Sequence, residues 1–263
     1  MYGAVIGDIV GSRFEWDHRH KSKDFEFWHE GSFFTDDTVC TVAVADILIN
    51  DLDPALGMQA WCRDYPGRGY GGWFGSWIHS DHPRPYHSYG NGAGMRVSPC
   101  ALLNRTDLDL ALSTSDRVTG TTHNHPEGIK GARAVTHSIW LALNHHPAGE
   151  IRRVIAREYG YDMSRSVDEI RPDYEFDETC QRSVPESIIC ALESATFEDG
   201  IRNAISIGGD SDTIGAMAGP IAEALHGIDD HHVRRARRHL TTRMIGVLDT
   251  LYERSGLPLP SDG

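Results

Sequence analysis

Apolar residues recur at helical spacing along much of the chain. In Thr38–Asn50 the apolar positions are too dense for a half-exposed strand, and Asp36 and Asp37 just before them are candidates to cap a helix, although the β-branched residues leave a strand open. In Gly131–Asn144 and His232–Glu253 apolar residues repeat every three or four positions, which is typical of amphipathic helices. The pattern therefore predicts a helix in each segment.

A further helix is indicated by Ser183 and Pro185, which precede an apolar run as a cap and a first-turn proline. Convincing alternating strands bounded by hairpin turns are absent from the sequence. A chain of 263 residues is long enough to bury one large core. We therefore expect an all-α fold in which residues 1–263 form a single domain.

Three segments interrupt the helical pattern. Residues 66–99 are rich in glycine, proline and aromatic residues, a mixture too broken for a helix and too rich in rings for a disordered linker. We expect them to form a structured loop region that lines a site. Residues 105–125 are polar and turn-like, and the tail 257–263 is expected to be loosely held.

Three glycines recur every four residues near the start of the chain, at Gly3, Gly7 and Gly11. On a helix they would form a smooth stripe against which a second helix packs closely, and close packing is the role we favour for them. Asp8 and Glu15 lie among them, and an acidic side chain inside an apolar turn needs a partner.

Composition narrows the class of protein. The chain holds 38 acidic and 25 basic residues, a formal charge of −13, which argues against nonspecific binding to nucleic acid or to anionic membranes. Its 5 cysteines are odd in number, widely spaced and never in a C-x-x-C pair, so neither a disulfide framework nor a zinc finger is indicated. The first residues carry no basic leader, and no run of 18 apolar residues occurs. We expect a cytoplasmic protein.

Two similar acidic clusters are the most informative feature. Each places two carboxylates and two hydroxyls within four residues at the start of an apolar helix: Thr35-Asp36-Asp37-Thr38 and Asp210-Ser211-Asp212-Thr213. Such hard oxygen ligands suit Mg²⁺, Mn²⁺ or Ca²⁺ rather than zinc or copper. If the two helix starts meet, four carboxylates converge, and two divalent ions roughly 3.5–4 Å apart would offset their repulsion.

The alternative is that these residues only cap their helices. A cap needs one acceptor, so two carboxylates at each helix start exceed the requirement. The Gly208-Gly209 step before Asp210 also permits the close backbone approach of a metal loop. From spacing alone, both interpretations stay open.

Two weaker candidates lie between the acidic clusters. The run from Gly90 to Gly94 could present backbone N–H groups to a phosphate, although it lacks the Gly-Lys-Ser/Thr ending of a Walker A loop. The segment from His123 to Glu127 could offer ligands or a base, although a loop histidine is more often structural.

With these motifs assembled, the chain resembles the ADP-ribosylglycohydrolase family, the group that includes the dinitrogenase-reductase-activating glycohydrolase. Five motifs carry the resemblance, in this order along the chain: Gly7-Asp8 with Gly11-Ser12 and Glu15; Phe34-Thr35-Asp36-Asp37-Thr38; Ser88-Tyr89-Gly90-Asn91-Gly92-Ala93 with Met95-Arg96; Thr122-His123-Asn124-His125-Pro126; and Gly208-Gly209-Asp210-Ser211-Asp212-Thr213-Ile214-Gly215. The chain departs from the family's pattern at Gly94, where relatives often carry alanine, and it is compact for the family.

The resemblance implies a compact orthogonal helical bundle with two Mg²⁺ or Mn²⁺ ions. By motif, it implies six metal ligands: Thr35, Asp36, Asp37, Asp210, Asp212 and Thr213. It places Glu15 beside the ions as a nearby or gating carboxylate. The residues implied to bind substrate, at the diphosphate and the distal ribose, are Ser88, Tyr89, Gly90, Asn91, Gly92 and His125.

The implied activity is hydrolysis that removes ADP-ribose from modified side chains, arginine-linked ones favoured, by cleavage at the anomeric carbon of the distal ribose. Glu15, Asp36 and Asp37 are the residues expected to accept the proton. The partner would be an ADP-ribosylated protein or a small ADP-ribose conjugate, bound by a monomer. The alternatives are a hydrolase of O-acetyl-ADP-ribose or of serine-linked ADP-ribose, a non-catalytic ADP-ribose-binding module, and a metal-dependent phosphohydrolase.

Overall fold

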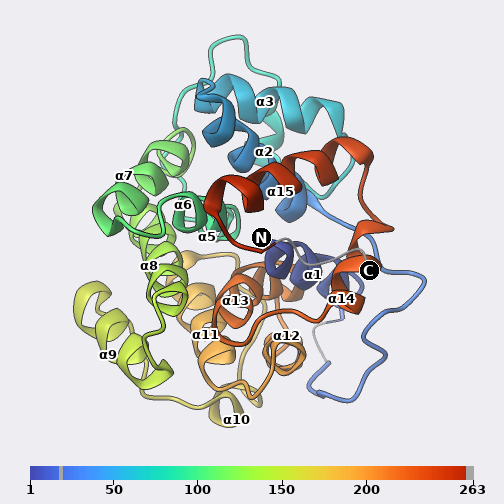
Figure 1. The fold of residues 1–263 in the computed structure, drawn as a ribbon, viewed down its shortest axis with the longest axis vertical. Coiled ribbons are helices and arrows are strands. Elements are labelled where there is room, and N and C mark those ends of the chain that lie inside the picture. The colour runs from blue at the N-terminus through green and yellow to red at the C-terminus, as the bar shows by residue number, and fades with distance from the viewer. Residues whose placement is uncertain (18–19, 259–263) are drawn as a thin grey trace.

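The computed structural model describes residues 1–17 and 20–258, and the regular elements of that part of the chain are helices that cross in several directions (Figure 1). The first eight are α1 (Tyr2–Gly11), α2 (Asp36–Asn50), α3 (Pro54–Asp64), α4 (Gly72–Ile78), α5 (Gly92–Met95), α6 (Ser98–Leu103), α7 (Leu108–Thr119) and α8 (Pro126–Leu143). The next seven are α9 (Ala148–Tyr159), α10 (Val167–Ile170), α11 (Cys180–Leu192), α12 (Phe197–Ser206), α13 (Ser211–His226), α14 (Asp230–Arg237) and α15 (Thr242–Ser255). The prediction of an all-α fold is confirmed.

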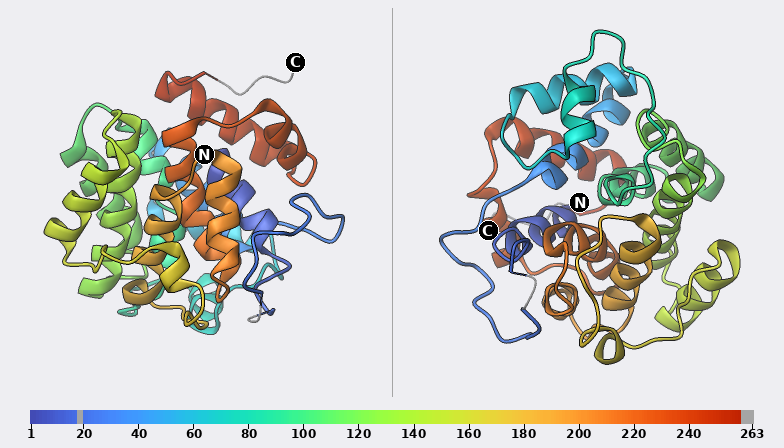
Figure 2. Two further views of the ribbon diagram at one scale, coloured as in Figure 1. Left: turned by 90° about the horizontal axis from the view of Figure 1, so that it is seen from below. Right: turned by 180° about the vertical axis from the view of Figure 1, so that it is seen from behind.

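Helix α1 lies in the middle of the molecule. All ten of its residues are buried. Figure 2 shows it between the elements around α2 on one side and those around α12 and α13 on the other. The two helices whose N-terminal turns carry the acidic clusters therefore both pack against α1.

Glycines let α1 and α13 pack with their backbones in contact, along what we call the glycine seam: Gly3, Gly7 and Gly11 of α1 against Gly215 and Gly219 of α13. A Cβ atom added to Gly7 would lie 2.0 Å from the carbonyl oxygen of Gly215, which is well inside van der Waals contact. The close packing expected from the glycine spacing is therefore present in the structure.

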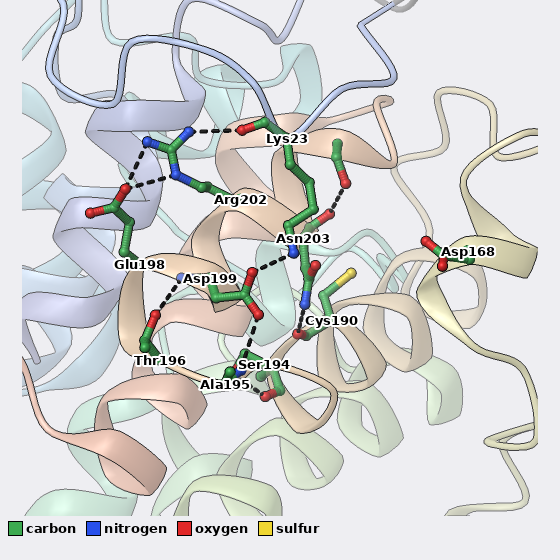
Figure 3. A network of polar contacts seen from close by, with 12 residues as sticks. Lys23, Asp168, Cys190, Ser194, Ala195, Thr196, Glu198, Asp199, Arg202 and Asn203 are labelled. Atoms are coloured by element: carbon green, nitrogen blue, oxygen red, sulfur yellow. Dashed lines mark hydrogen bonds and ion pairs between the residues drawn. The ribbon is translucent and has the colours of Figure 1, made fainter.

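The described chain between α1 and α2 is anchored on α12 by charged side chains (Figure 3). Lys23 forms an ion pair with Asp199. The guanidinium of Arg202 donates to the carbonyl oxygens of Lys23 and Phe25 at 2.8 and 2.9 Å, and to the carboxylate of Glu198 at 2.7 Å. These contacts hold the segment that leads from Glu15 to the start of α2.

Several predicted helix ends were wrong. Helix α2 begins two residues earlier than predicted, because Thr35 is the cap and Asp36 opens the first turn. Ser183 does not cap a helix, since α11 begins at Cys180 and the Ser183 hydroxyl donates to the carbonyl of Thr179 at 2.7 Å; Pro185 lies inside that helix. Likewise, α8 begins ahead of the predicted start.

Two larger departures have local causes. The predicted helix His232–Glu253 is two helices, α14 and α15, because the side chain of Thr241 accepts from the N–H of Met244 and caps a new helix. The segment 105–125 was expected to be turn-like, but it contains α7, which Asp107 caps by accepting from the N–H of Leu110. Residues 66–99 are structured as expected but hold two short helices, α4 and α5. Part of the predicted loose tail, 259–263, lies outside the described residues.

The buried apolar side chains form a contiguous core that includes residues from α1, α2, α8, α11 and α13. All 5 cysteines are buried and free. In the described part of the chain, none of the helices is both long and apolar enough to span a bilayer.

Candidate active site

The two acidic clusters meet against α1. One carboxylate oxygen from each of Asp8, Asp37 and Asp212 lies within 4.8 Å of the other two, and all three side chains are buried. The hydroxyl of Thr213 donates to Oδ2 of Asp37 at 3.2 Å, which links the start of α13 directly to the start of α2. Residues that are far apart in the sequence therefore form a single acidic cluster.

The carboxylate of Asp8 caps α2 from outside that helix. It accepts from the backbone N–H of Thr35 and of Thr38, each at 3.0 Å, from the hydroxyl of Thr35 at 2.7 Å, and from the hydroxyl of Thr38. These bonds provide the partner that a buried Asp8 requires. They also satisfy much of the N-terminus of α2, so Asp36 and Asp37 are available for another role.

The other acidic residues of the cluster are held by contacts from several elements. The backbone N–H of Asp36 donates to the carbonyl of Arg68 at 2.8 Å. The side chain of Asn91 donates to Asp210 at 2.6 Å, which ties the glycine-rich segment to the acidic cluster. Oδ1 of Asp212 accepts from the N–H of Thr213 at 2.9 Å.

Burial and mutual repulsion disfavour the charged forms of these groups. Burial, and next the charge of Asp8, raises the pKa of Asp36 to about 8. Burial likewise raises the pKa of Asp8 to about 6 and those of Asp37 and Asp212 well above their usual range. Among residues 1–17 and 20–258, no lysine or arginine pairs with them. The cluster must therefore take up protons or cations.

The residues present fit divalent cations. The donors are carboxylate and hydroxyl oxygens, which Mg²⁺, Mn²⁺ and Ca²⁺ prefer. In addition, Oδ1 of Asp37 is buried and has no hydrogen-bond partner among the described residues. An unpartnered buried carboxylate oxygen is costly unless something positive faces it, so a cation here would satisfy it.

A cavity of about 540 Å³ opens above the acidic cluster. Its walls come from the segment around α4, the glycine-rich segment, the acidic clusters and the chain before α11. The lining residues are Glu15, Asp36, Asp37, Gly69, Gly71, Gly72, Trp73, Phe74, Tyr86, His87, Ser88, Tyr89, Gly90, Asn91, Gly92, Met95, Arg96, His123, Glu178, Thr179, Asp210, Asp212 and Thr213. The loop region that we expected to line a site therefore does line this cavity.

Glu15 lies at the cavity, half-buried. Burial, and then the charges of Asp210 and Asp8, raises its pKa to about 7. A carboxyl that titrates near neutral pH suits proton transfer. The next residue, Trp16, is 75% exposed, and Trp73, which lines the cavity, is 80% exposed.

Two residues expected at the site do not line the cavity. Thr35 is buried beneath it and holds Asp8, as described above. His125 caps α8 by accepting from the N–H of Glu127 at 3.1 Å, and its ring packs 5.1 Å from that of Tyr89. The histidine in the lining is His123, two residues earlier.

The lining residues that were not predicted individually include Trp73, Arg96 and Glu178. Arg96 lies two residues after the glycine-rich segment and was part of a quoted motif, so its position was the available signal. Trp73 lies within residues 66–99, the segment expected to line a site, whereas Glu178 carries no local signal because only the fold brings it to the cavity.

Comparisons with known proteins agree with this architecture. The profile of the family described as ADP-ribosylglycohydrolase matches residues 1–256. The ADP-ribosylarginine hydrolase Tri1 of Pseudomonas putida (strain GB-1) is 25% identical over 262 residues, 87% of this chain and 70% of that protein. The ADP-ribosylhydrolase ARH3 of Danio rerio is 26% identical over 304 residues, 87% of this chain and 82% of that protein. A solved chain described as an ADP-ribosylglycohydrolase-related protein complex has the same fold, with a TM-score of 0.75 and 23% identity over 97% of this chain and 95% of its own.

Proposed function

Because this chain belongs to the ADP-ribosylglycohydrolase family, whose members are hydrolases, we propose that it removes ADP-ribose from modified side chains by cleaving the bond at the anomeric carbon of the distal ribose. The observation that carries the proposal is the cavity itself. Its floor holds buried carboxylates, and one wall is the segment from Ser88 to Gly92. A sugar diphosphate would lie with its ribose toward the carboxylates and its phosphates toward the backbone N–H groups of the loop.

We favour an arginine linkage for the substrate. One of the relatives described above is an ADP-ribosylarginine hydrolase. The guanidinium of a modified arginine carries a positive charge in the substrate, and the cavity is lined by Glu15, Asp36 and Glu178. An acidic cavity with an exposed aromatic side chain, Trp73, attracts a cation by its field and by the face of the ring.

The proposed cofactor is a pair of Mg²⁺ or Mn²⁺ ions, held by Thr35, Asp36, Asp37, Asp210, Asp212 and Thr213. Bound there, divalent cations would act as Lewis acids on ribose hydroxyls and lower the pKa of water. The Thr35 hydroxyl donates a hydrogen bond to Asp8 at 2.7 Å, which leaves an oxygen lone pair available.

Glu15 is the proposed general base, with Asp36 and Asp37 as the other candidates. Its position on the cavity wall and its raised pKa allow it to take the proton of an attacking water at neutral pH. The water oxygen then bonds to the anomeric carbon, the bond to the guanidinium nitrogen breaks, and that nitrogen receives the proton. The products are ADP-ribose and unmodified arginine. The segment from Ser88 to Gly92 holds the diphosphate during this step.

The experiment is product analysis by mass spectrometry. Arginine-linked and serine-linked ADP-ribosyl peptides and O-acetyl-ADP-ribose are each incubated with the protein in Mg²⁺, Mn²⁺ or EDTA. We expect metal-dependent release of ADP-ribose, fastest from the arginine-linked peptide. Asp36→Ala and Asp212→Ala should lose this activity while keeping the helical circular dichroism spectrum.

Other outcomes identify the alternatives. Binding of ADP-ribose without turnover in any metal would indicate a binding module. Release of AMP or phosphate in place of ADP-ribose would indicate a phosphohydrolase. Equal rates in EDTA and in metal would contradict the dinuclear site.

A further inference from the structure

Arg96 is a buried cation beside the cavity. Its side chain is 1% exposed, and among the residues that the structure describes no carboxylate pairs with it. Its Nη1 atom has no hydrogen-bond partner in the described part of the chain, and the ring of Phe74 lies 5.3 Å from its Cζ atom. A buried charge without a counter-ion is destabilising, so a specific use of the guanidinium is needed to explain it.

The polar contacts of Arg96 lead to His123. Its Nη2 atom lies 2.8 Å from Nδ1 of His123 and 3.3 Å from the hydroxyl oxygen of Thr122, while Nε donates to the carbonyl of Gly92. That hydroxyl oxygen is also 2.7 Å from Nδ1 of His123. The imidazole is therefore held from one side by a group that carries a permanent positive charge.

Donor chemistry fixes the tautomer of this histidine. A guanidinium has hydrogens on all its nitrogens and can only donate, so Nδ1 of His123 must accept. A neutral imidazole that accepts at Nδ1 carries its proton on Nε2. Burial, and next the charge of Arg96, also lowers the pKa of His123 well below its usual value, so the ring stays neutral.

The Nε2 atom of His123 faces the glycine-rich segment. A Cβ atom added to Gly92 would lie 3.2 Å from Nε2, and one added to Gly90 would lie 3.6 Å from it. Both glycines line the cavity together with His123. Within the described residues no protein group accepts from Nε2, so its N–H is available to a bound molecule.

We propose that Arg96 is a positioning residue, which fixes His123 as a neutral imidazole whose Nε2–H donates to an oxygen atom of substrate bound against Gly90 and Gly92. The oxygen belongs to a ribose hydroxyl or a phosphate, and both offer the same acceptor chemistry. The identity of the substrate rests on the function proposed above, whereas the tautomer does not. In an acidic cavity a free histidine would tend to protonate, and burial together with the charge of Arg96 opposes this.

The tautomer can be measured directly in the wild-type protein. Long-range ¹H–¹⁵N spectra at pH 7 distinguish a protonated from an unprotonated ring nitrogen, and the resonances of His123 are assigned by their loss in His123→Gln. We expect a neutral ring with the proton on Nε2. A proton on Nδ1, or a doubly protonated ring, would overturn the proposal without any variant of Arg96.

Substitutions then test the use of the donor. Glutamine places an amide nitrogen near the position of Nε2, and asparagine places one near Nδ1. With ADP-ribose as the probe in Mn²⁺ buffer, calorimetry should show His123→Gln within about threefold of the wild-type Kd and His123→Asn about tenfold weaker, the size of one neutral hydrogen bond. The reverse order would overturn the proposal.

Variants of Arg96 complete the test. Arg96→Met should weaken the binding of ADP-ribose about tenfold and change the ¹⁵N pattern of His123. Arg96→Lys, which keeps a donor and a charge, should recover part of the affinity and part of the pattern. Arg171→Met, at a part-buried arginine bonded to Ser206, is the control and should change neither. Unchanged ADP-ribose affinity and ¹⁵N pattern in folded Arg96→Met would refute the positioning role.

If Arg96→Met does not fold, the wild-type spectrum and the two His123 variants still decide the matter. If the wild-type protein shows the expected tautomer but binds no ADP-ribose, the function proposed above is wrong and the tautomer assignment stands. The two failures are therefore distinguishable.

Discussion

Replacing Asp212 by asparagine should make the metal-free protein more stable and the metal-loaded protein less so. Asparagine keeps the size of the side chain, and its oxygen can still accept from the N–H of Thr213, as Oδ1 does at 2.9 Å. The change removes only the charge. It therefore isolates the electrostatic role of one carboxylate in the buried cluster.

The magnitude follows from the geometry. Carboxylate oxygens of Asp8, Asp37 and Asp212 lie within 4.8 Å of one another. At an effective dielectric constant of roughly 20, two charges at that separation repel by about 3 kcal/mol. Proton uptake already relieves part of this repulsion. We therefore expect Asp212→Asn to raise the free energy of unfolding in EDTA by about 2 kcal/mol, which is about 5 °C in Tm for a chain of this size.

Metal reverses the order of stability. A cation at 100 times its Kd stabilises the wild-type protein by about 3 kcal/mol through mass action. Asp212→Asn lacks one proposed ligand, so its Tm should rise much less when Mn²⁺ is added. The assay is thermal unfolding followed by circular dichroism, at pH 8, in EDTA and in a Mn²⁺ series.

Asp168→Asn is the matched control, since that side chain is 87% exposed on α10 and should respond in neither condition. A fall in the Tm of Asp212→Asn in EDTA, together with an unchanged response to Mn²⁺, would refute the reasoning. It would mean that Asp212 acts only as a structural acceptor.

Three further predictions concern the same cluster. The pKa of Asp36 is raised to about 8 in the folded chain, so near neutral pH the folded state binds a proton that the unfolded state releases. The Tm in EDTA should therefore fall as the pH rises from about 6 to 9, and Mn²⁺ should flatten this dependence. A Tm that rises with pH would contradict the prediction. Glu15→Gln should lower kcat about 100-fold and remove the rise of kcat/KM with pH through about 7, and an unchanged pH profile would exclude Glu15 as the base. Gly11→Ala should weaken Mn²⁺ binding measured by calorimetry, while Gly3→Ala should lower only the Tm, and equal metal affinities would contradict this.

Part of the candidate site could be predicted because its signal is local. The acidic residues at the start of α2 and of α13 exceed what capping needs, and that excess is visible in the sequence. The structure explains the excess at α2, since the capping oxygens come from Asp8 of α1 and from the Thr35 hydroxyl in place of Asp36 and Asp37. The role of Asp8 could not be read from sequence, because capping from another helix leaves no local pattern.

Other features depended on tertiary contacts. His123 and His125 are two residues apart in the sequence, yet one is buried beside Arg96 and the other caps α8, and only burial distinguishes them. Helix α7 escaped prediction because its buried face includes Ala111 and Ser115, which do not stand out as an apolar repeat. The break after α14 likewise depends on a single threonine cap, which a continuing apolar repeat conceals.

The glycine seam links the fold to the chemistry. Along α1 the contacts run from Gly3 against Gly219, through Gly7 against Gly215, to Gly11, where an added Cβ would lie 2.5 Å from Cα of Asp212. The seam therefore ends at a proposed metal ligand. Because Asp8 lies on the same helix as the glycines, the backbone approach that they permit also sets the distance from Asp8 to the start of α13. A larger residue in the seam must either separate the helices or shift the acidic cluster, so the glycine spacing and the carboxylate spacing are constrained together.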